Sequence, residues 1–250
     1  MSRFTSRSLF LSGLFLGLAA LRLAAAPAAP APFDGLVLAF KEVVVSSPVQ
    51  STIESIAFKE GDRVKAGQTL SKLYGRIEEL DMLRAKAALE KREFDFKGSK
   101  NLYAEKIISE DEALKNKIEL DLARLQYEQA TEVFKQRTIN APIDGLVVEK
   151  LREVGESVTA TQPMFRLVDI SRVYVMFYIR AEDLPRLKIN DTVEVSSAIS
   201  GEVRTFSGTV DFIDPRVDAA SGLLRVKVLV DNLDGIIKPG LRAAVTIPAK

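Results

Sequence analysis

Two stretches of this chain carry the same residue pattern at a constant offset of 94 positions, without a gap. The first runs from Pro48 to Leu73 and the second from Pro142 to Leu167. The matched pairs are Pro48 and Pro142, Gly61 and Gly155, Val64 and Val158, Ala66 and Ala160, Gln68 and Gln162, and Leu73 and Leu167. Such a repeat predicts two copies of one supersecondary unit, neither of which can bury its apolar face alone. The copies should pack on each other, and the residues between them should leave the domain and return.

Each copy is a series of short alternating runs broken by glycine. In the first copy, Glu60-Gly61-Asp62 and Ala66-Gly67-Gln68 separate the runs, which predicts short strands joined by tight turns. A glycine is expected where such a turn needs a positive φ. We therefore interpret five residues as structural turn residues without a ligand, namely Gly61, Gly67, Gly155, Pro239 and Gly240.

Between the copies the sequence period changes to that of helices. From Arg76 to about Arg137 there is no proline, and Leu, Ala, Glu, Lys, Arg and Gln predominate, all of which favour helix. Ser109 followed by Glu112 predicts a capping box at the start of a second helix. Apolar residues recur at helical spacings and predict the seam of a two-helix antiparallel coiled coil. They are Leu80, Leu83, Ala87 and Phe94 in the first arm and Leu114, Ile118, Leu122 and Leu125 in the second.

The last third of the chain again has the pattern of strands. An apolar run at 173–179 is followed by a short helical turn at 181–187 and four further strand-like runs at 192–196, 203–213, 223–230 and 243–247. Several short strands separated by Gly and Pro turns predict a small β-barrel.

The first residues have the pattern of a secretory signal peptide. Arg3 and Arg7 precede an apolar run, and small residues follow it, which predicts cleavage after Ala28. The alternative is an uncleaved N-terminal anchor, because the apolar run reaches about 18 residues if Arg22 extends to the interface. Either alternative places the bulk of the protein outside the cytoplasm.

Composition excludes several kinds of site. The chain has no cysteine and no histidine, so disulfides, thiolate metal sites, cysteine nucleophiles and His-based catalytic triads are impossible. A formal net charge of +1 offers no electrostatic case for a nucleic-acid partner. Asp211, Asp214 and Asp218 form a local acidic cluster that we attribute to turn capping rather than to a hard cation. No catalytic, cofactor-binding or metal-binding residue is assigned.

The repeated pattern Gly-[Asp/Glu]-x-Val-x-Ala-x-Gln before a leucine resembles the half-motif of biotinyl/lipoyl domains. Here a helical segment stands where a carrier domain has a short hairpin, and a predicted barrel follows. This order resembles the periplasmic adaptor subunits, or membrane fusion proteins, of tripartite efflux systems of the resistance-nodulation-division and HlyD type. The barrel signature that adds to the resemblance is 212–218, 221–228, Asp231-Asn232 and Lys238-Pro239-Gly240-Leu241.

The resemblance implies a mainly β fold with an inserted α-helical hairpin. A split lipoyl-like domain (a barrel-sandwich hybrid) would carry an antiparallel coiled-coil hairpin and be followed by a C-terminal β-barrel. The expected divisions are 1–28 signal peptide, 29–42 linker and first strand, 43–75 first lipoyl-like half, 76–138 hairpin, 139–169 second half and 170–250 barrel. Because the chain ends at Lys250, we expect no sequence for the C-terminal part of a membrane-proximal domain.

The resemblance also implies a non-catalytic protein of the periplasm, associated with the inner membrane. It would link an inner-membrane transporter to an outer-membrane exit duct, as part of a homo-oligomeric ring and without a cofactor. The hairpin tip would contact the duct or another hairpin through Glu105, Lys106, Ile107, Ile108 and Ser109. Two adjacent isoleucines at an exposed turn favour a partner contact, although one of them could simply close the coiled coil as a staple.

Two alternatives belong to other classes of protein. One is a biotin or lipoyl carrier, for which Lys72 is the nearest lysine to the junction after the first half. That residue is expected on a strand rather than on an exposed turn, so the motif lacks its structural context. The other is a static scaffold of the cell envelope without a role in transport.

Overall fold

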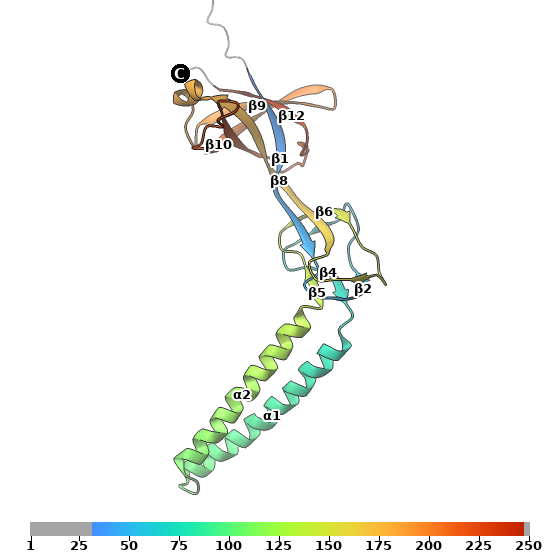
Figure 1. Ribbon diagram of the computed structural model, residues 1–250, viewed down its shortest axis with the longest axis vertical. Coiled ribbons are helices and arrows are strands. Elements are labelled where there is room, and N and C mark those ends of the chain that lie inside the picture. Colours follow the sequence, from blue (N-terminus) through green and yellow to red (C-terminus); the bar gives the residue numbers. More distant parts are fainter. Residues whose placement is uncertain (1–31, 248–250) are drawn as a thin grey trace, which may run out of the picture.

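A computed structural model describes residues 32–247, so the predicted signal peptide lies outside the described residues. The described chain is elongated, with a β-barrel, a smaller β-sandwich and a pair of helices following one another along its length (Figure 1). None of its helices is long and apolar enough to cross a membrane.

Six strands close into the barrel, in the order β1-β12-β9-β10-β11-β8, with β8 pairing back to β1. The strands are β1 (Phe33–Ser46), β8 (Pro163–Arg180), β9 (Thr192–Ile199), β10 (Glu202–Ile213), β11 (Leu223–Asp231) and β12 (Arg242–Thr246). A 3-10 helix, η1 (Ala181–Arg186), follows β8. Alternate residues of each strand face the core, as the period of a strand requires.

The first strand is longer than the sequence pattern indicates. Residues 33–36 pair with β12 in the barrel, although they fall in the predicted linker and first strand at 29–42. The strand then continues without a break into the sandwich, as β8 does beside it (Figure 1). The pairing of β1 with β8 is irregular between Ala39 and Lys41, where the ribbon passes from barrel to sandwich. These two strands are therefore the covalent link between the two β domains.

The sandwich is built from both copies of the repeat. Its remaining strands are β2 (Ser51–Ile56), β3 (Arg63–Val64), β4 (Thr69–Leu73), β5 (Thr138–Asn140), β6 (Gly145–Lys150) and β7 (Ser157–Val158). β2 of the first copy pairs with β7 of the second, and β6 of the second copy pairs with β3 of the first. Each copy thus supplies a strand to the other, as expected of units that cannot fold separately.

The hydrogen bonds of the two copies match at the same offset. The N–H of Ile53 donates to Glu156 O (2.9 Å), and the N–H of Val147 donates to Asp62 O (3.0 Å). Gly155 N–H donates to Ile53 O (2.9 Å), and Gly61 N–H donates to Val147 O (2.8 Å). The copies are consequently related by an approximate twofold axis, and individual backbone hydrogen bonds follow this symmetry.

Two separate apolar cores hold the β domains. The barrel core contains Val37, Val175, Phe177, Val226 and Val245 among others. The sandwich core is made of repeat partners, which are Val45 with Ile139, Ile53 with Val147, Val64 with Val158, Leu70 with Met164, and Leu73 with Leu167, together with Ala141 and Phe165. Neither core contains a residue from the two helices.

The segment between the copies forms two helices, α1 (Arg76–Ala104, 29 residues) and α2 (Glu110–Lys135, 26 residues), which lie side by side (Figure 1). They leave the sandwich between β4 and β5, which are themselves paired at Lys72 and Thr138. Because the two strand ends are adjacent, the chain can depart and return without disturbing the sandwich.

Candidate functional site

Arg137 joins the base of the helix pair to the sandwich. Its guanidinium forms an ion pair with Glu78 in the first turn of α1 (Nη2 to Oε1, 2.6 Å) and donates to the carbonyl of Gln50 (3.1 Å). Gly75, the residue before α1, leaves room for this side chain, because a Cβ there would lie 2.5 Å from Arg137 Cγ. Both charged groups are largely buried, so the contact holds the helices at one orientation.

The helices face each other through a seam that differs from the predicted one. The less exposed positions alternate at spacings of three and four, which is the heptad pattern. They are Met82, Ala85, Leu89, Arg92, Phe96 and Ser99 in α1 and Ala113, Asn116, Leu120, Ala123, Tyr127, Ala130 and Phe134 in α2. Several of these residues are small or polar, which explains why a search for large apolar residues misses them.

The predicted seam residues point away from the partner helix, so that prediction was wrong. Leu80, Leu83, Phe94, Leu114, Ile118, Leu122 and Leu125 are all between 46% and 78% exposed, and Ala87 is exposed as well. Each helix therefore carries a second apolar stripe on its outer side. In the described part of the chain, nothing covers these stripes.

Polar contacts fix the height at which the helices face each other. Asn116 Nδ2 donates to Ser99 Oγ (3.3 Å), and Arg92 pairs with Glu119 (2.7 Å). One such polar layer in a seam favours a single register over shifted alternatives.

The turn between the helices contains all five of the predicted tip residues. The N–H of Ile107 donates to Leu102 O (2.8 Å) and that of Lys106 to Tyr103 O (2.9 Å), which is the Schellman pattern at a helix end. Lys106 occupies the left-handed position (φ 60). Ser109 then caps α2 by accepting from the N–H of Glu112 (3.2 Å), as the capping box predicts.

The two isoleucines of the turn are unequal. Ile107 is 63% exposed, whereas Ile108 is half-buried beside the start of α2. Ile108 thus matches the staple interpretation, and Ile107 matches the interpretation as a contact residue. Glu105, Lys106 and Ser109 are exposed around it.

The predicted turn residues occupy turns. Gly61 and Gly155 have the same φ (90), and Gly67 and Gly240 have φ of 83 and 91. Pro239 precedes Gly240 in the turn before β12. Lys72 lies within β4, between Ser55 of β2 and Thr138 of β5, and not on a turn.

Each member of the acidic cluster in the barrel has its own partner. Asp214 is buried and accepts from Arg216 Nε (3.2 Å) and Arg225 Nη2 (3.0 Å). Hydrogen bonds from Arg216 lower the pKa of Asp214 below its ordinary value. Asp218 accepts from Ser221 N–H (2.8 Å) and Asp211 from the Tyr174 hydroxyl (3.1 Å). Within residues 32–247 no group of three or more His, Cys, Asp or Glu residues is placed to hold a metal ion.

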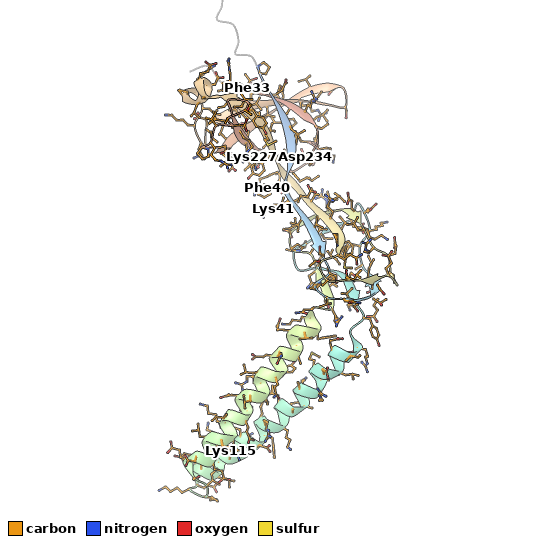
Figure 2. All side chains as sticks on the ribbon, viewed as in Figure 1. Phe33, Phe40, Lys41, Lys115, Lys227 and Asp234 are labelled. Carbon is orange, nitrogen blue, oxygen red and sulfur yellow. The ribbon has the colours of Figure 1, made fainter. Side chains whose placement is uncertain are left out.

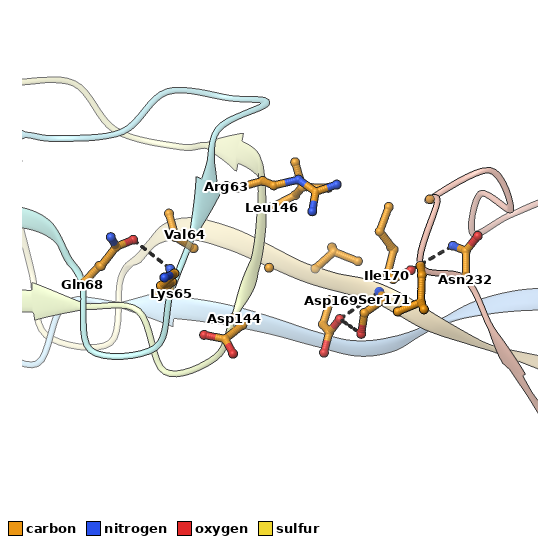
Figure 3. A pocket seen from close by; sticks show the side chains of 14 residues that line it. Arg63, Val64, Lys65, Gln68, Asp144, Leu146, Asp169, Ile170, Ser171 and Asn232 are labelled. Carbon is orange, nitrogen blue, oxygen red and sulfur yellow. Dashed lines mark hydrogen bonds between the residues drawn. The ribbon is translucent and has the colours of Figure 1, made fainter.

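A cleft that no sequence pattern predicts lies between the sandwich and the barrel. It has a volume of about 760 Å³ and is lined by Arg63 and Lys65 from β3 and the following turn, Leu146 from β6, and Ile170 and Asn232 on the barrel side (Figure 3). Asn232 fixes the barrel wall, because its Nδ2 donates to the carbonyls of Ile170 (2.8 Å) and Ile237 (2.9 Å).

Comparison with known proteins matches both β domains. Residues 41–169 match the family model described as "CzcB-like, barrel-sandwich hybrid domain", and residues 172–250 match "CusB-like, beta-barrel domain". The Cobalt-zinc-cadmium resistance protein CzcB of Cupriavidus metallidurans is 25% identical over 210 residues, which cover 78% of this chain and 40% of that protein. The Multidrug resistance protein MdtA of Pantoea ananatis is 24% identical over 249 residues, covering 86% of this chain and 60% of that protein.

Solved structures share the fold. A MacA-MexA chimeric protein containing the α-hairpin domain of Pseudomonas aeruginosa MexA aligns with a TM-score of 0.74 at 20% identity, covering 87% of this chain and 80% of that one. The chain spans 40% and 60% of the lengths of the two curated relatives named above, which is less than two thirds of each. The homologues of this chain are membrane fusion adaptor proteins, which are non-catalytic. The chain belongs to the CzcB-like barrel-sandwich hybrid family, the membrane fusion proteins of efflux systems.

Proposed function

We propose that this protein is a periplasmic adaptor that links an inner-membrane transporter to an outer-membrane exit duct. The observation that carries the proposal is the exposed tip at Ile107, held away from both β domains by two helices. At 1.5 Å per residue, α1 extends about 40 Å from the sandwich. An exposed apolar residue at the end of a rigid projection is suited to contact another protein.

In this role, each segment of the chain would have its own part. Residues 43–75 and 139–169 would be the lipoyl-like halves, 76–138 an antiparallel coiled-coil hairpin, and 170–250 the barrel that meets the transporter. The N-terminal segment would export the chain to the periplasm and keep it near the inner membrane, whether cleaved or retained. The copies would stand side by side in a ring around the path of the substrate.

The residues of this chain do not identify the exported substrate, because an adaptor need not contact the compound that is exported. One relative is named for cobalt, zinc and cadmium resistance and another for multidrug resistance. These metal salts and a cationic dye such as ethidium are therefore the first compounds to test.

The role of the tip can be tested in a deletion strain complemented with variants of the full chain. We expect Ile107→Glu to lose the tolerance that the wild-type chain restores, because a charge would have to be buried at the duct contact. Val154→Glu, a change at a similarly exposed residue of the sandwich, is the matched control and should restore tolerance. Full restoration by Ile107→Glu would contradict the tip contact.

The same strain separates the alternatives. Unchanged tolerance and dye retention after deletion would favour the static scaffold. The carrier alternative requires a modified lysine, and intact-mass spectrometry of the exported chain should find none. The position of Lys72 within a paired strand supports this expectation, because a ligase needs an exposed turn.

A further inference from the structure

The cleft between the sandwich and the barrel has the size of a binding site for a small molecule. Its volume of about 760 Å³ lies within the range that is typical of ligand pockets. One wall belongs to the sandwich and the other to the barrel loop at 232–235, and residues 168–171 of β8 connect them (Figure 3). A ligand held in this cleft would therefore contact both β domains.

The sandwich wall carries two cations without an anionic partner. Arg63 and Lys65 are exposed and flank the buried Val64, so the period of a strand turns both away from the sandwich core. Neither side chain forms an ion pair or a hydrogen bond in the part of the chain that the structure describes. Arg137 and Arg166, elsewhere in the sandwich, each pair with a glutamate. Unpaired cations on a concave surface favour an anionic ligand.

Two carboxylates also line the cleft, but each already accepts a hydrogen bond from the protein. Asp144 Oδ1 accepts from the N–H of Ala66 (2.7 Å). Asp169 Oδ1 accepts from both the N–H (3.0 Å) and the hydroxyl (2.7 Å) of Ser171. In Figure 3 both carboxylates lie below the connecting strands, whereas Arg63 lies above them. The cleft thus has a cationic side and a separate acidic side.

Apolar side chains continue the cationic side of the cleft. Leu146 is the cross-strand neighbour of Arg63 in the pairing of β6 with β3, and the two lie together in Figure 3. Towards the barrel, Ile170 is half-buried and Leu233 is 84% exposed. A leucine this exposed, beside other apolar groups in a cleft, favours contact with an apolar ligand group.

Other classes of small ligand fit these walls less well. None of the described residues that line the cleft is aromatic, so a nucleotide base would have no stacking partner. Inorganic phosphate would meet the two cations but leave the apolar groups in water. A divalent cation would meet two carboxylates that already accept hydrogen bonds and two cations that repel it.

We propose that the cleft binds an amphiphilic anion with one alkyl chain, such as a long-chain fatty acid. Arg63 and Lys65 would hold the anionic head through charge-assisted hydrogen bonds. Leu146, Ile170 and Leu233 would cover the alkyl chain and remove it from water. The site is separate from the hairpin tip, so the inference goes beyond the bridging role and does not depend on it.

Calorimetric titration of the full chain compares ligands that differ in one feature each. Decanoate should bind, whereas decanol, which lacks the charge, and acetate, which lacks the chain, should bind about tenfold more weakly or less. Decyl phosphate should also bind, and the tighter of the two anions shows whether a fatty acid or a phosphate-headed lipid is the better ligand. Decyltrimethylammonium that binds as tightly as decanoate would overturn the proposal, as would decanoate that does not bind.

A charge variant locates the anionic head. Arg63→Gln with Lys65→Gln should weaken decanoate binding by about tenfold, because both contacts to the head are lost. Arg124→Gln with Lys117→Gln is the matched control, since it removes the same charges from exposed residues of α2 and should leave the affinity unchanged. Thermal unfolding shows whether both variants remain folded. Equal affinities of the two variants would contradict the assignment of the head.

A second variant locates the alkyl chain. Leu233→Ser should weaken decanoate binding by about fivefold, because less of the chain is removed from water. Val203→Ser, at a residue of β10 that is 74% exposed, is the matched control and should bind decanoate as the wild type does. An affinity that Leu233→Ser leaves unchanged would place the chain elsewhere and contradict the proposal.

Photolabelling separates the cleft from the apolar stripes of the helices. A fatty acid with a diazirine at its chain end is photolysed on the full chain, and the labelled peptides are mapped by mass spectrometry. We expect the label within 168–171 or 232–235, and an excess of decanoate should remove it. Label confined to residues 76–135 would overturn the proposal. None of these outcomes bears on the tip experiment at Ile107.

Discussion

At some equivalent positions the two copies of the repeat have different residue types but the same backbone conformation. Gly67 and Thr161 occupy equivalent turns, and both have positive φ (83 and 66). The N–H of Gly67 donates to Ala141 O (2.8 Å) and that of Thr161 to Ser47 O (2.8 Å). A β-branched residue in this region is strained, so the second copy keeps the turn at an energetic cost.

Replacement of Thr161 by glycine should therefore stabilise the protein. We expect Thr161→Gly to raise the free energy of unfolding by about 1 kcal/mol, because the strain of a left-handed residue exceeds the added freedom of the unfolded chain. The reverse change in the first copy, Gly67→Thr, should lower it by a similar amount. Urea unfolding measures both. A destabilised Thr161→Gly would show that its hydroxyl bond to Ala160 O (2.6 Å) matters more than φ.

Asp214 makes the stability of the barrel depend on pH in the acid range. Its pKa is lowered mainly by hydrogen bonds from Arg216, so its contribution to stability is complete above the unfolded value of about 3.9 and is lost as the pH falls through the folded pKa. We expect Asp214→Asn to lower the melting temperature at pH 6 and the difference from wild type to shrink below pH 4. A constant difference from pH 6 to pH 3 would contradict this assignment.

At the scale of elements, burial separates two leucines of α2 that are two residues apart. Leu120 is 7% exposed and faces α1, whereas Leu122 is 55% exposed and faces outward. The heptad positions are filled by residues such as Ala123, Asn116 and Ser99, so packing and register rather than apolar bulk identify the seam.

This difference predicts unequal effects of truncation. Leu120→Ala should destabilise the helix pair by about 2 kcal/mol, because it removes buried apolar contacts. Leu122→Ala should change stability by less than about 0.5 kcal/mol in the isolated chain. Thermal unfolding followed at 222 nm, at a protein concentration where the chain is monomeric, measures both. Equal losses of stability in the two variants would support the seam predicted from the sequence instead.

At the scale of the whole molecule, the helices are an addition to a β structure that is complete without them. Both cores consist of residues outside 76–135, and β4 and β5 are already paired where the helices depart. Side chains of the two β domains gather in separate clusters along the molecule (Figure 2). Loss of the helices should therefore remove the projection from the sandwich but leave the folding of the two β domains intact.

Excision of the helices tests this independence. A chain in which residues 77–136 are replaced by a short Gly-Ser turn should keep a cooperative thermal transition within a few degrees of the wild type, because no core residue is removed. Differential scanning calorimetry is the measurement, and the same excision should abolish efflux in the complemented strain. An unfolded product would mean that Glu78 and Arg137 are needed for the sandwich and not only for the orientation of the helices.

Features that depend on local geometry can be recognised from the sequence alone. They include the repeat, the glycines of its turns and the capping residue Ser109. Gly61 and Gly155 adopt one φ, and partners such as Ile53 and Val147 enter one core. Position-by-position matching therefore predicted the pairing of the two halves and the place where the helices leave. The strand-like runs and Gly and Pro turns of the last third predicted the barrel that follows, and the family resemblance implied the same barrel.

The direction in which each helix faces could not be obtained in this way. Leu80 and Leu122 are as apolar as core residues, and only the position of the opposite helix shows that they face outward. The continuity of β1 through two domains and the cleft beside Arg63 likewise depend on contacts between distant segments. Residue type reports how much apolar surface a helix has, whereas the tertiary contacts select which part of it is buried.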